Sequence, residues 1–341
     1  MKRVESISES FFFDDMDIED YEIIERFGRT YAGLIYHVKK KSENNKDYLM
    51  FQIENDYPEL NFEVERLINL PDRTGMLIIY GLIKSNNSDF KGTNLITEYP
   101  EKGCLADIIS TTNFTDPESP INPFKLACLF YSLSNAFRIL HSEDIFYKYF
   151  DPSFIYLGSD YELKLANPGI SAFFNPSVYH SEEENDQLYL APEIFQGQPA
   201  SIYSDIYSFG SLLYQLYSSE IRFPKSNQNK PFMSNIMDGI RPLFPISTPL
   251  MVRNTVTQCW STVPTDRPFS KQILQNMIRS PEFFFNLKNP KEFYEYQRLL
   301  IPPDVMHAQI FSASSSPLSK SASRSSKKSQ KVTLTRSKSE P

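Results

Sequence analysis

The sequence predicts an α+β fold in which a small, β-rich part precedes a larger and mainly helical part. Strand-like apolar runs gather in the first third of the chain, and apolar residues recur at helical spacing from Pro123 onward. A hairpin pattern at Ile145–Ile170, with Ser159-Asp160 at its turn, separates the first long helix from the rest. The length of 341 residues suits one two-lobed domain of about 250 residues with flanking segments.

The β-rich part contains the expected strands and one helix. The strands lie in Tyr21–Val38, which holds two strands joined by a turn, and in Tyr48–Ile53, Gly75–Lys84 and Asn94–Tyr99. The helix spans Asn61–Leu70, because its apolar residues are spaced to share one face.

The strongest helical pattern is Pro123–His141, whose apolar residues repeat at helical spacing along its whole length. Asn122 is a suitable N-cap, and Pro123 suits the first helical position, where its missing N–H costs no hydrogen bond. Further helices are expected at Leu105–Ile109, Ser204–Leu216 and Phe269–Ile278, with an aromatic helical segment inside Pro281–Ile310.

Composition bounds the class of protein. The three cysteines, Cys104, Cys128 and Cys259, are scattered, which favours buried thiols in a reducing compartment over a disulfide framework or a metal site. The 4 histidines are scattered as well, so no metal is expected. No apolar run reaches membrane-spanning length and the first residues are polar. We therefore expect neither a signal peptide nor a membrane span, and a cytoplasmic location.

The net charge of −7 is unevenly distributed. Residues 312–341 carry seven Lys or Arg and one Glu, which is +6, and subtracting this from −7 leaves −13 for residues 1–311. A body this acidic is not expected to bind nucleic acid or an acidic membrane.

A series of motifs in a fixed order resembles the eukaryotic protein kinase superfamily over roughly residues 21–280. The series comprises a glycine-rich loop with Gly28 and Gly33, the strand Tyr48–Ile53 with Gln52 at the lysine position, a helix with Glu63, a hinge at Glu98-Tyr99-Pro100, a catalytic loop at 147–154, a metal loop at Asn167-Pro168-Gly169, Ala191-Pro192-Glu193, Asp205, and Arg267-Pro268. The ending, Cys259 to Phe269, is most similar to the tyrosine-kinase-like group.

This resemblance implies a two-lobed, protein kinase-like fold with an N-lobe at 21–98, a hinge at 98–103 and a C-lobe at 104–280. The flanks are then a flexible N-terminal extension at 1–20, a helical extension at 281–311 and a disordered Ser/Lys/Arg-rich tail at 312–341. The helical extension either docks onto the C-lobe or presents a face to a partner.

Measured against the family pattern, the residues that do the chemistry are replaced. Gln52 stands at the phosphate-pairing lysine, Tyr149 at the aspartate base, Asp151 at the catalytic-loop lysine, and Phe154 and Asn167 at the two magnesium ligands. Mg²⁺ favours carboxylate oxygen, and a tyrosine with a reference pKa of about 10 is a poor proton acceptor at neutral pH. The resemblance therefore implies a pseudokinase, a kinase homologue without phosphotransfer.

Nucleotide binding is a separate question. Met50 and Tyr156 fall where the family places a small residue and a Leu against the two adenine faces, so they either fill the slot or are ordinary core residues. Thr30 replaces the middle glycine of the loop that approaches phosphates. We expect no cofactor, although ATP could bind without Mg²⁺ through the hinge backbone.

Other matched positions imply structural roles. The resemblance implies a buried ion pair between Glu193 and Arg267, and support of the catalytic loop by Asp205. Glu63 either forms a neutral hydrogen bond with Gln52 or is solvated. The acidic run Glu182–Glu184 is either a fixed mimic of a regulatory phosphate or a solvated loop.

The sequence leaves two classes of function open. The first is a non-catalytic signalling scaffold or allosteric partner that binds proteins, with an active kinase as one candidate. The tail end RSKSEP also resembles the 14-3-3-binding pattern, with Ser339 as the phosphosite. The alternative is a divergent Ser/Thr protein kinase or another ATP-dependent transferase on the kinase fold. The absence of a carboxylate at 149, 154 and 167 favours the scaffold.

Overall fold

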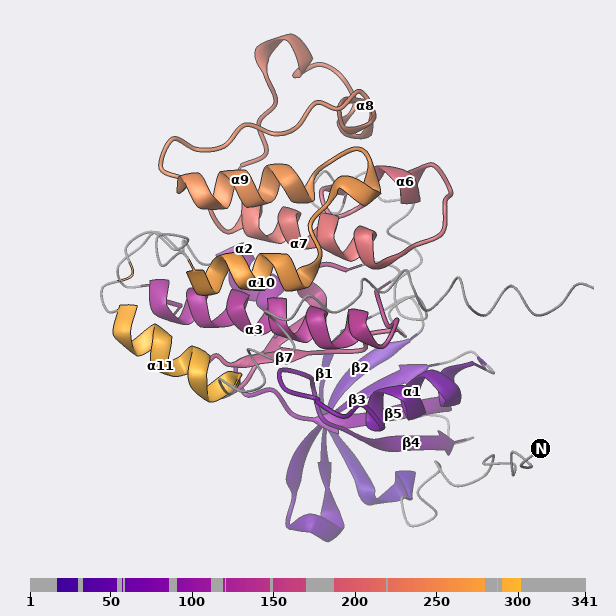
Figure 1. Cartoon of the computed structure of the whole chain (residues 1–341). Coiled ribbons are helices and arrows are strands. Elements are labelled where there is room, and N and C mark those ends of the chain that lie inside the picture. Colours follow the sequence, from indigo (N-terminus) through magenta and orange to yellow (C-terminus); the bar gives the residue numbers. More distant parts are fainter. Residues whose placement is uncertain are drawn as a thin grey trace, which may run out of the picture.

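The computed structural model describes residues 17–29, 33–53, 57, 59–85, 91–111, 119, 121–147, 150–169, 187–218, 220–279, 287 and 290–301. These residues form a sheet lobe and a helical lobe, with α1 beside the sheet (Figure 1).

The sheet lobe is built on a five-stranded antiparallel sheet of order β1-β2-β3-β5-β4. Its elements are β1 (Tyr21–Arg29), β2 (Leu34–Lys40), β3 (Lys46–Ile53), α1 (Leu60–Ile68), β4 (Ile79–Ser85) and β5 (Gly92–Glu98), with short 3-10 turns η1 (Ile18–Asp20) and η2 (Lys41–Glu43). Asn44 and Asn45 close the β2–β3 hairpin with positive φ, a conformation that Asn tolerates better than most residues.

Each face of the sheet is covered by its own apolar cluster, and the cluster that a side chain belongs to shows which face it is on. One face carries an apolar cluster that joins β2, β3 and α1 to residues of the helical lobe, among them Cys104, Tyr156 and Ala166. The other face carries a cluster made by the sheet and η1 alone, which includes Tyr48 and Met50. We call these the cleft face and the outer face.

The helical lobe surrounds one long buried helix. Its elements are α2 (Leu105–Thr111), α3 (Pro123–Ser142), η3 (Pro152–Phe154), β6 (Ile155–Leu157), β7 (Leu163–Leu165), α6 (Pro192–Phe195), α7 (Ile202–Gln215), η5 (Lys225–Asn227), α8 (Phe232–Met237), α9 (Leu250–Cys259), η6 (Pro264–Asp266), α10 (Ser270–Arg279) and α11 (Pro290–Leu300). The Asn122 side chain caps α3 by accepting from the Lys125 N–H at 2.9 Å.

The C-terminal helix α11 lies along α3 (Figure 1). Its Phe293 is 1% exposed and meets the Tyr131 ring edge-on at 5.8 Å, while the hydroxyls of Tyr296 and Ser132 are 2.6 Å apart. Leu299 points outward and is 84% exposed. The described part of the C-terminal extension therefore docks onto the helical lobe.

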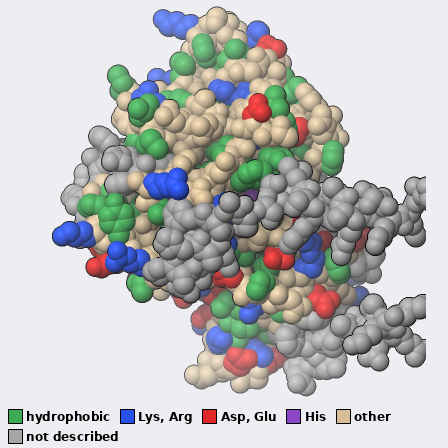
Figure 2. All heavy atoms as spheres, in the orientation of Figure 1, with side chains coloured by type: hydrophobic (Ala, Val, Ile, Leu, Met, Phe, Trp, Pro, Cys, Tyr) green, Lys and Arg blue, Asp and Glu red, His purple; other side chains and the backbone are tan. Residues whose placement is uncertain are grey.

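The α+β, two-lobed fold expected from the sequence is confirmed. Figure 2 shows acidic and basic side chains interspersed over the sheet lobe on the face drawn. Within the described ranges, no helix combines the length and apolar character needed to cross a bilayer.

Candidate functional site

The register of β3 corrects two sequence expectations. Met50 and Gln52 are two residues apart and share a face, and that face is the outer one, because Met50 packs among sheet residues alone. Phe51, paired with Ile35 of β2, faces the cleft instead. Met50 therefore does not fill the cleft, and Gln52 does not stand where a phosphate-pairing lysine would reach; its side chain donates to the Lys91 carbonyl at 3.1 Å.

Phe51 and Tyr156 are buried together in the cleft-face cluster between the lobes. Phe51 is 2% and Tyr156 3% exposed, with ring centroids 6.3 Å apart, one from β3 of the sheet lobe and one from β6 of the helical lobe. Phe27 of β1 adds a third ring 6.2 Å from Tyr156. Burial raises the pKa of Tyr156 well above its ordinary value, so its hydroxyl stays protonated.

Two residues beyond Phe51 on the same face lies Ile53, which is fully buried against the cleft-face cluster. By strand alternation, Ile53, the residue after Gln52, lies on the cleft face with Phe51. An aliphatic side chain there supplies no cation for a phosphate.

The hinge offers few free backbone donors. Pro100 has no N–H, and the Glu98 N–H donates to the Ile78 carbonyl at 2.9 Å. The Glu98 carboxylate is bound to Lys164 at 2.9 Å and to the Ile78 N–H at 2.8 Å. The Tyr99 ring stacks on His37 at 4.2 Å and meets Phe27 edge-on at 6.2 Å.

The described part of the catalytic-loop region is anchored by aromatic packing. Tyr147, at the first position of the family motif, is fully buried, and its hydroxyl donates to the Ala166 carbonyl at 2.5 Å. Its ring lies 5.0 Å from Phe150 and 5.4 Å from Phe154. Phe154 is thus a core residue with no metal-ligating atom.

Asn167 occupies the position of the metal-loop aspartate and is 4% exposed. Its backbone is left-handed, with φ of 53°, and its Oδ1 has no hydrogen-bond partner among the described residues. Asp151 is the N-cap of η3, and its carboxylate accepts the Ser153 N–H at 2.6 Å. Within the described ranges, no group of three or more His, Cys, Asp or Glu is arranged to hold a metal.

Asp205 supports the loop region as a buried acceptor. Its Oδ2 accepts the Tyr147 N–H at 3.0 Å and lies 2.9 Å from His141 Nε2, and His141 Nδ1 lies 3.3 Å from the Ser270 hydroxyl. Burial raises the pKa of Asp205 to about 6, against the opposing effect of the bonds to His141 and Tyr147.

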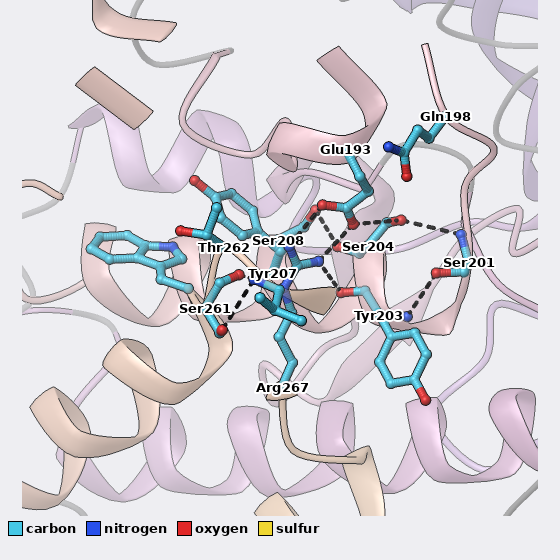
Figure 3. Close-up of polar contacts among 12 residues, drawn as sticks. Glu193, Gln198, Ser201, Tyr203, Ser204, Tyr207, Ser208, Ser261, Thr262 and Arg267 are labelled. Carbon is cyan, nitrogen blue, oxygen red and sulfur yellow. Dashed lines mark hydrogen bonds and ion pairs between the residues drawn. The ribbon is translucent and has the colours of Figure 1, made fainter. Parts of the chain in front are cut away.

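Glu193 and Arg267 form a bidentate buried ion pair, with N–O distances of 2.6 and 2.7 Å (Figure 3). Arg267 also donates to the carbonyls of Ser261 and Tyr203, and its guanidinium lies 5.1 Å from the Tyr207 ring centroid. The pair joins the start of α6, the start of α7 and the loop before α10 into one unit.

Comparison with known proteins identifies the family. Residues 26–277 match the sequence profile described as protein tyrosine and serine/threonine kinase. The chain belongs to this protein kinase family. The dual specificity protein kinase pyk3 of Dictyostelium discoideum is 25% identical over 208 residues, covering 59% of this chain and 15% of that protein. The human mitogen-activated protein kinase kinase kinase 7 is 23% identical over 303 residues, covering 85% of this chain and 46% of that protein.

A probable serine/threonine-protein kinase of Dictyostelium discoideum is 21% identical over 296 residues, covering 86% of this chain and 19% of that protein. The kinase-family chain thus spans less than half the length of these relatives.

Four sites singled out in the sequence fall outside the described residues, namely Thr30, Tyr149 and Glu182–Glu184 of the kinase pattern and Ser339 of the 14-3-3-binding pattern. Gly28 lies in β1 opposite Ile35, and Gly33 directly precedes β2, so the two glycines flank residues 30–32, which are also outside the described ranges.

Sequence reasoning missed Phe51, Phe27 and Ile53 as cleft residues. The signal that could have found them is the Asn44-Asn45 turn, because a hairpin closed there pairs Ile35 with Phe51. Fixing the turn first would have placed Phe51 on the cleft face.

Proposed function

We propose that this kinase-family chain does not transfer phosphate and acts as a signalling scaffold or allosteric partner of other proteins. The observation that carries the proposal is the aromatic filling of the cleft. Phe51 and Tyr156 meet edge-on between the lobes and both are almost fully buried. The proposal places the adenine slot at this contact.

The charges needed for phosphoryl transfer support the same proposal. The reaction depends on Mg²⁺ and cations that neutralise the phosphates. Ile53 offers no cation, Phe154 offers no ligand, and Asn167 offers a neutral amide oxygen. Ile53 belongs to the sheet lobe, and Phe154 and Asn167 belong to the helical lobe. Because all three lack the charge or ligand that phosphoryl transfer needs, no single substitution would restore the reaction.

We propose that the protein needs no cofactor and that any ATP binding is weak and independent of Mg²⁺. Of the hinge residues, the Glu98 N–H already donates to the Ile78 carbonyl and Pro100 has no N–H, which leaves at most the Tyr99 N–H among these three. One hinge bond without phosphate contacts gives little affinity.

The proposed partners are proteins, an active kinase being the first candidate, in the cytoplasm that the three free cysteines favour. Recognition of phosphorylated Ser339 by a 14-3-3 protein is part of this proposal. A synthetic tail peptide carrying phosphoserine at 339 is expected to bind a 14-3-3 protein, and equal binding of the unphosphorylated peptide would contradict it.

A phosphotransfer assay tests the main proposal. The full chain is incubated with radiolabelled ATP and Mg²⁺ or Mn²⁺, alone and with generic protein substrates. We expect no incorporation above a blank without protein. Incorporation that disappears in the Asp151→Asn variant would support the alternative, a divergent kinase that uses another carboxylate.

A further inference from the structure

Helix α1 packs against the helical lobe through Leu67, and among its described side chains Arg66 adds hydrogen bonds to that lobe. Its Nη2 donates to the backbone carbonyls of Glu143 at 3.0 Å and Asp144 at 3.3 Å. Its Nη1 binds Glu63 at 2.9 Å, one turn earlier in α1. A single guanidinium thus joins α1 to the turn that follows α3.

The carbonyls that Arg66 reaches lie at a helix end. Glu143 is the C-cap of the 20-residue helix α3, and Asp144 follows with a left-handed φ of 56°. The last carbonyls of a helix lack intrahelical partners and carry the negative end of its dipole. A planar guanidinium is suited to this end, because it is always charged and donates several hydrogen bonds in one plane.

Glu63 lies between this contact and the metal-loop segment. A Cβ added at Gly169 would come within 3.4 Å of Glu63 Oε2 and 3.3 Å of Ile145 Cγ2, and Gly169 has a φ of +75°. Position 169 is therefore packed tightly between α1 and the segment after α3, and only glycine fits without a shift. Arg66 neutralises the carboxylate that faces this junction.

We infer that Arg66 is a latch that fixes α1 against the helical lobe without any ligand in the cleft. The ion pair with Glu63 is internal to α1, whereas the bonds to Glu143 and Asp144 cross between the lobes. The position of α1 is then set by this chain alone. The inference does not depend on whether the cleft binds nucleotide, because it concerns the unliganded protein.

Hydrogen exchange on the full chain tests the latch. The Arg66→Ala variant is expected to exchange the amides of α1 (Leu60–Ile68) roughly tenfold faster than the wild type, because charge-assisted bonds to the helical lobe are lost. Amides of α7 (Ile202–Gln215) report on global stability and are expected to change much less.

Two variants serve as controls. Arg222→Ala removes an exposed arginine paired with Glu220, far along the chain from α1, and is expected to leave α1 exchange unchanged. Glu63→Gln removes the ion pair within α1 but keeps both carbonyl bonds, and is expected to accelerate exchange much less than Arg66→Ala.

The outcomes separate clearly. Equal α1 exchange in the wild type and Arg66→Ala would overturn the latch. Glu63→Gln as fast as Arg66→Ala would also overturn it, since the pair within α1 would then be what matters. If Arg66→Ala does not fold, the Arg66→Lys variant is measured instead, because a single ammonium cannot reproduce the several hydrogen bonds of the planar guanidinium. Faster α1 exchange in Arg66→Lys supports the latch, and unchanged exchange rejects it.

Discussion

Arg267 is an example of how one residue can hold distant segments together. The residue is 2% exposed, and its guanidinium binds both oxygens of Glu193 and the carbonyls of Ser261 and Tyr203. Because the charge is out of water, its stabilising effect depends on every partner being present.

We expect Glu193→Gln to lower the free energy of unfolding by roughly 3–5 kcal/mol, because it leaves the buried guanidinium without a counter-charge. Urea denaturation of the full chain measures this. The matched control is Glu220→Gln, which breaks the exposed pair with Arg222 and should change stability by less than about 1 kcal/mol. Equal losses in the two variants would contradict a structural role for Glu193.

Asp205 predicts a pH dependence. Burial raises its pKa from 3.8 to about 6 in the folded state, so between these values the folded protein holds a proton that the unfolded chain has released. The free energy of unfolding therefore falls as pH rises through this window. The wild type minus Asp205→Asn difference, measured by urea denaturation, should decrease across the window. A difference that rises with pH would contradict the burial effect.

At the scale of elements, the docked helix α11 completes the helical core. Phe293 covers the fully buried Tyr131 ring of α3, so removing the Phe293 side chain leaves a cavity between two helices.

We expect Phe293→Ala to destabilise the protein by roughly 3–5 kcal/mol. Leu299→Ala on the same helix removes an exposed side chain and should lie within about 0.5 kcal/mol of the wild type. Thermal unfolding of both variants checks this. If both alanine variants melt together with the wild type, α11 is not part of the core.

The sequence predicted the order of the elements well, because strand and helix periodicities are local properties. The face of β3 could not be predicted this way. Met50, Phe51, Gln52 and Ile53 are all buried, since clusters cover both faces of the sheet, so alternation carries no information about direction. The family pattern was therefore aligned to β3 in a way that assigned cleft positions to Met50 and Gln52, which lie on the outer face, because a shift of one residue exchanges the two faces of a strand.

The Arg66 contact could not be predicted either. Its acceptors are backbone carbonyls at the end of a helix 77 residues further along the chain, and any residue type supplies a carbonyl. By contrast, the ion pair between Glu193 and Arg267 could be predicted, because both residues lie in motifs that match the kinase pattern, Ala191-Pro192-Glu193 and Arg267-Pro268.

At the scale of the whole molecule, the two lobes meet through a packed interior. The cleft-face cluster is one continuous set of buried apolar residues that extends from β2 and β3 to Cys104, Tyr156 and Ala166. Backbone bonds reinforce this contact, with the Leu77 N–H donating to Leu165 at 2.9 Å and the Leu157 N–H to Gly103 at 2.9 Å. We propose that a nucleotide would have to displace the buried rings of Phe51 and Tyr156 to enter.

A thermal-shift titration of the full chain with ATP, with and without Mg²⁺, tests the central claim most directly. A ligand at about 100 times its Kd adds roughly 2.7 kcal/mol to the folded state and raises the melting temperature. The filled cleft predicts no shift at millimolar ATP, or at most a small shift that is the same with and without Mg²⁺. A clear shift that requires Mg²⁺ would contradict both the filled cleft and the proposed loss of phosphotransfer.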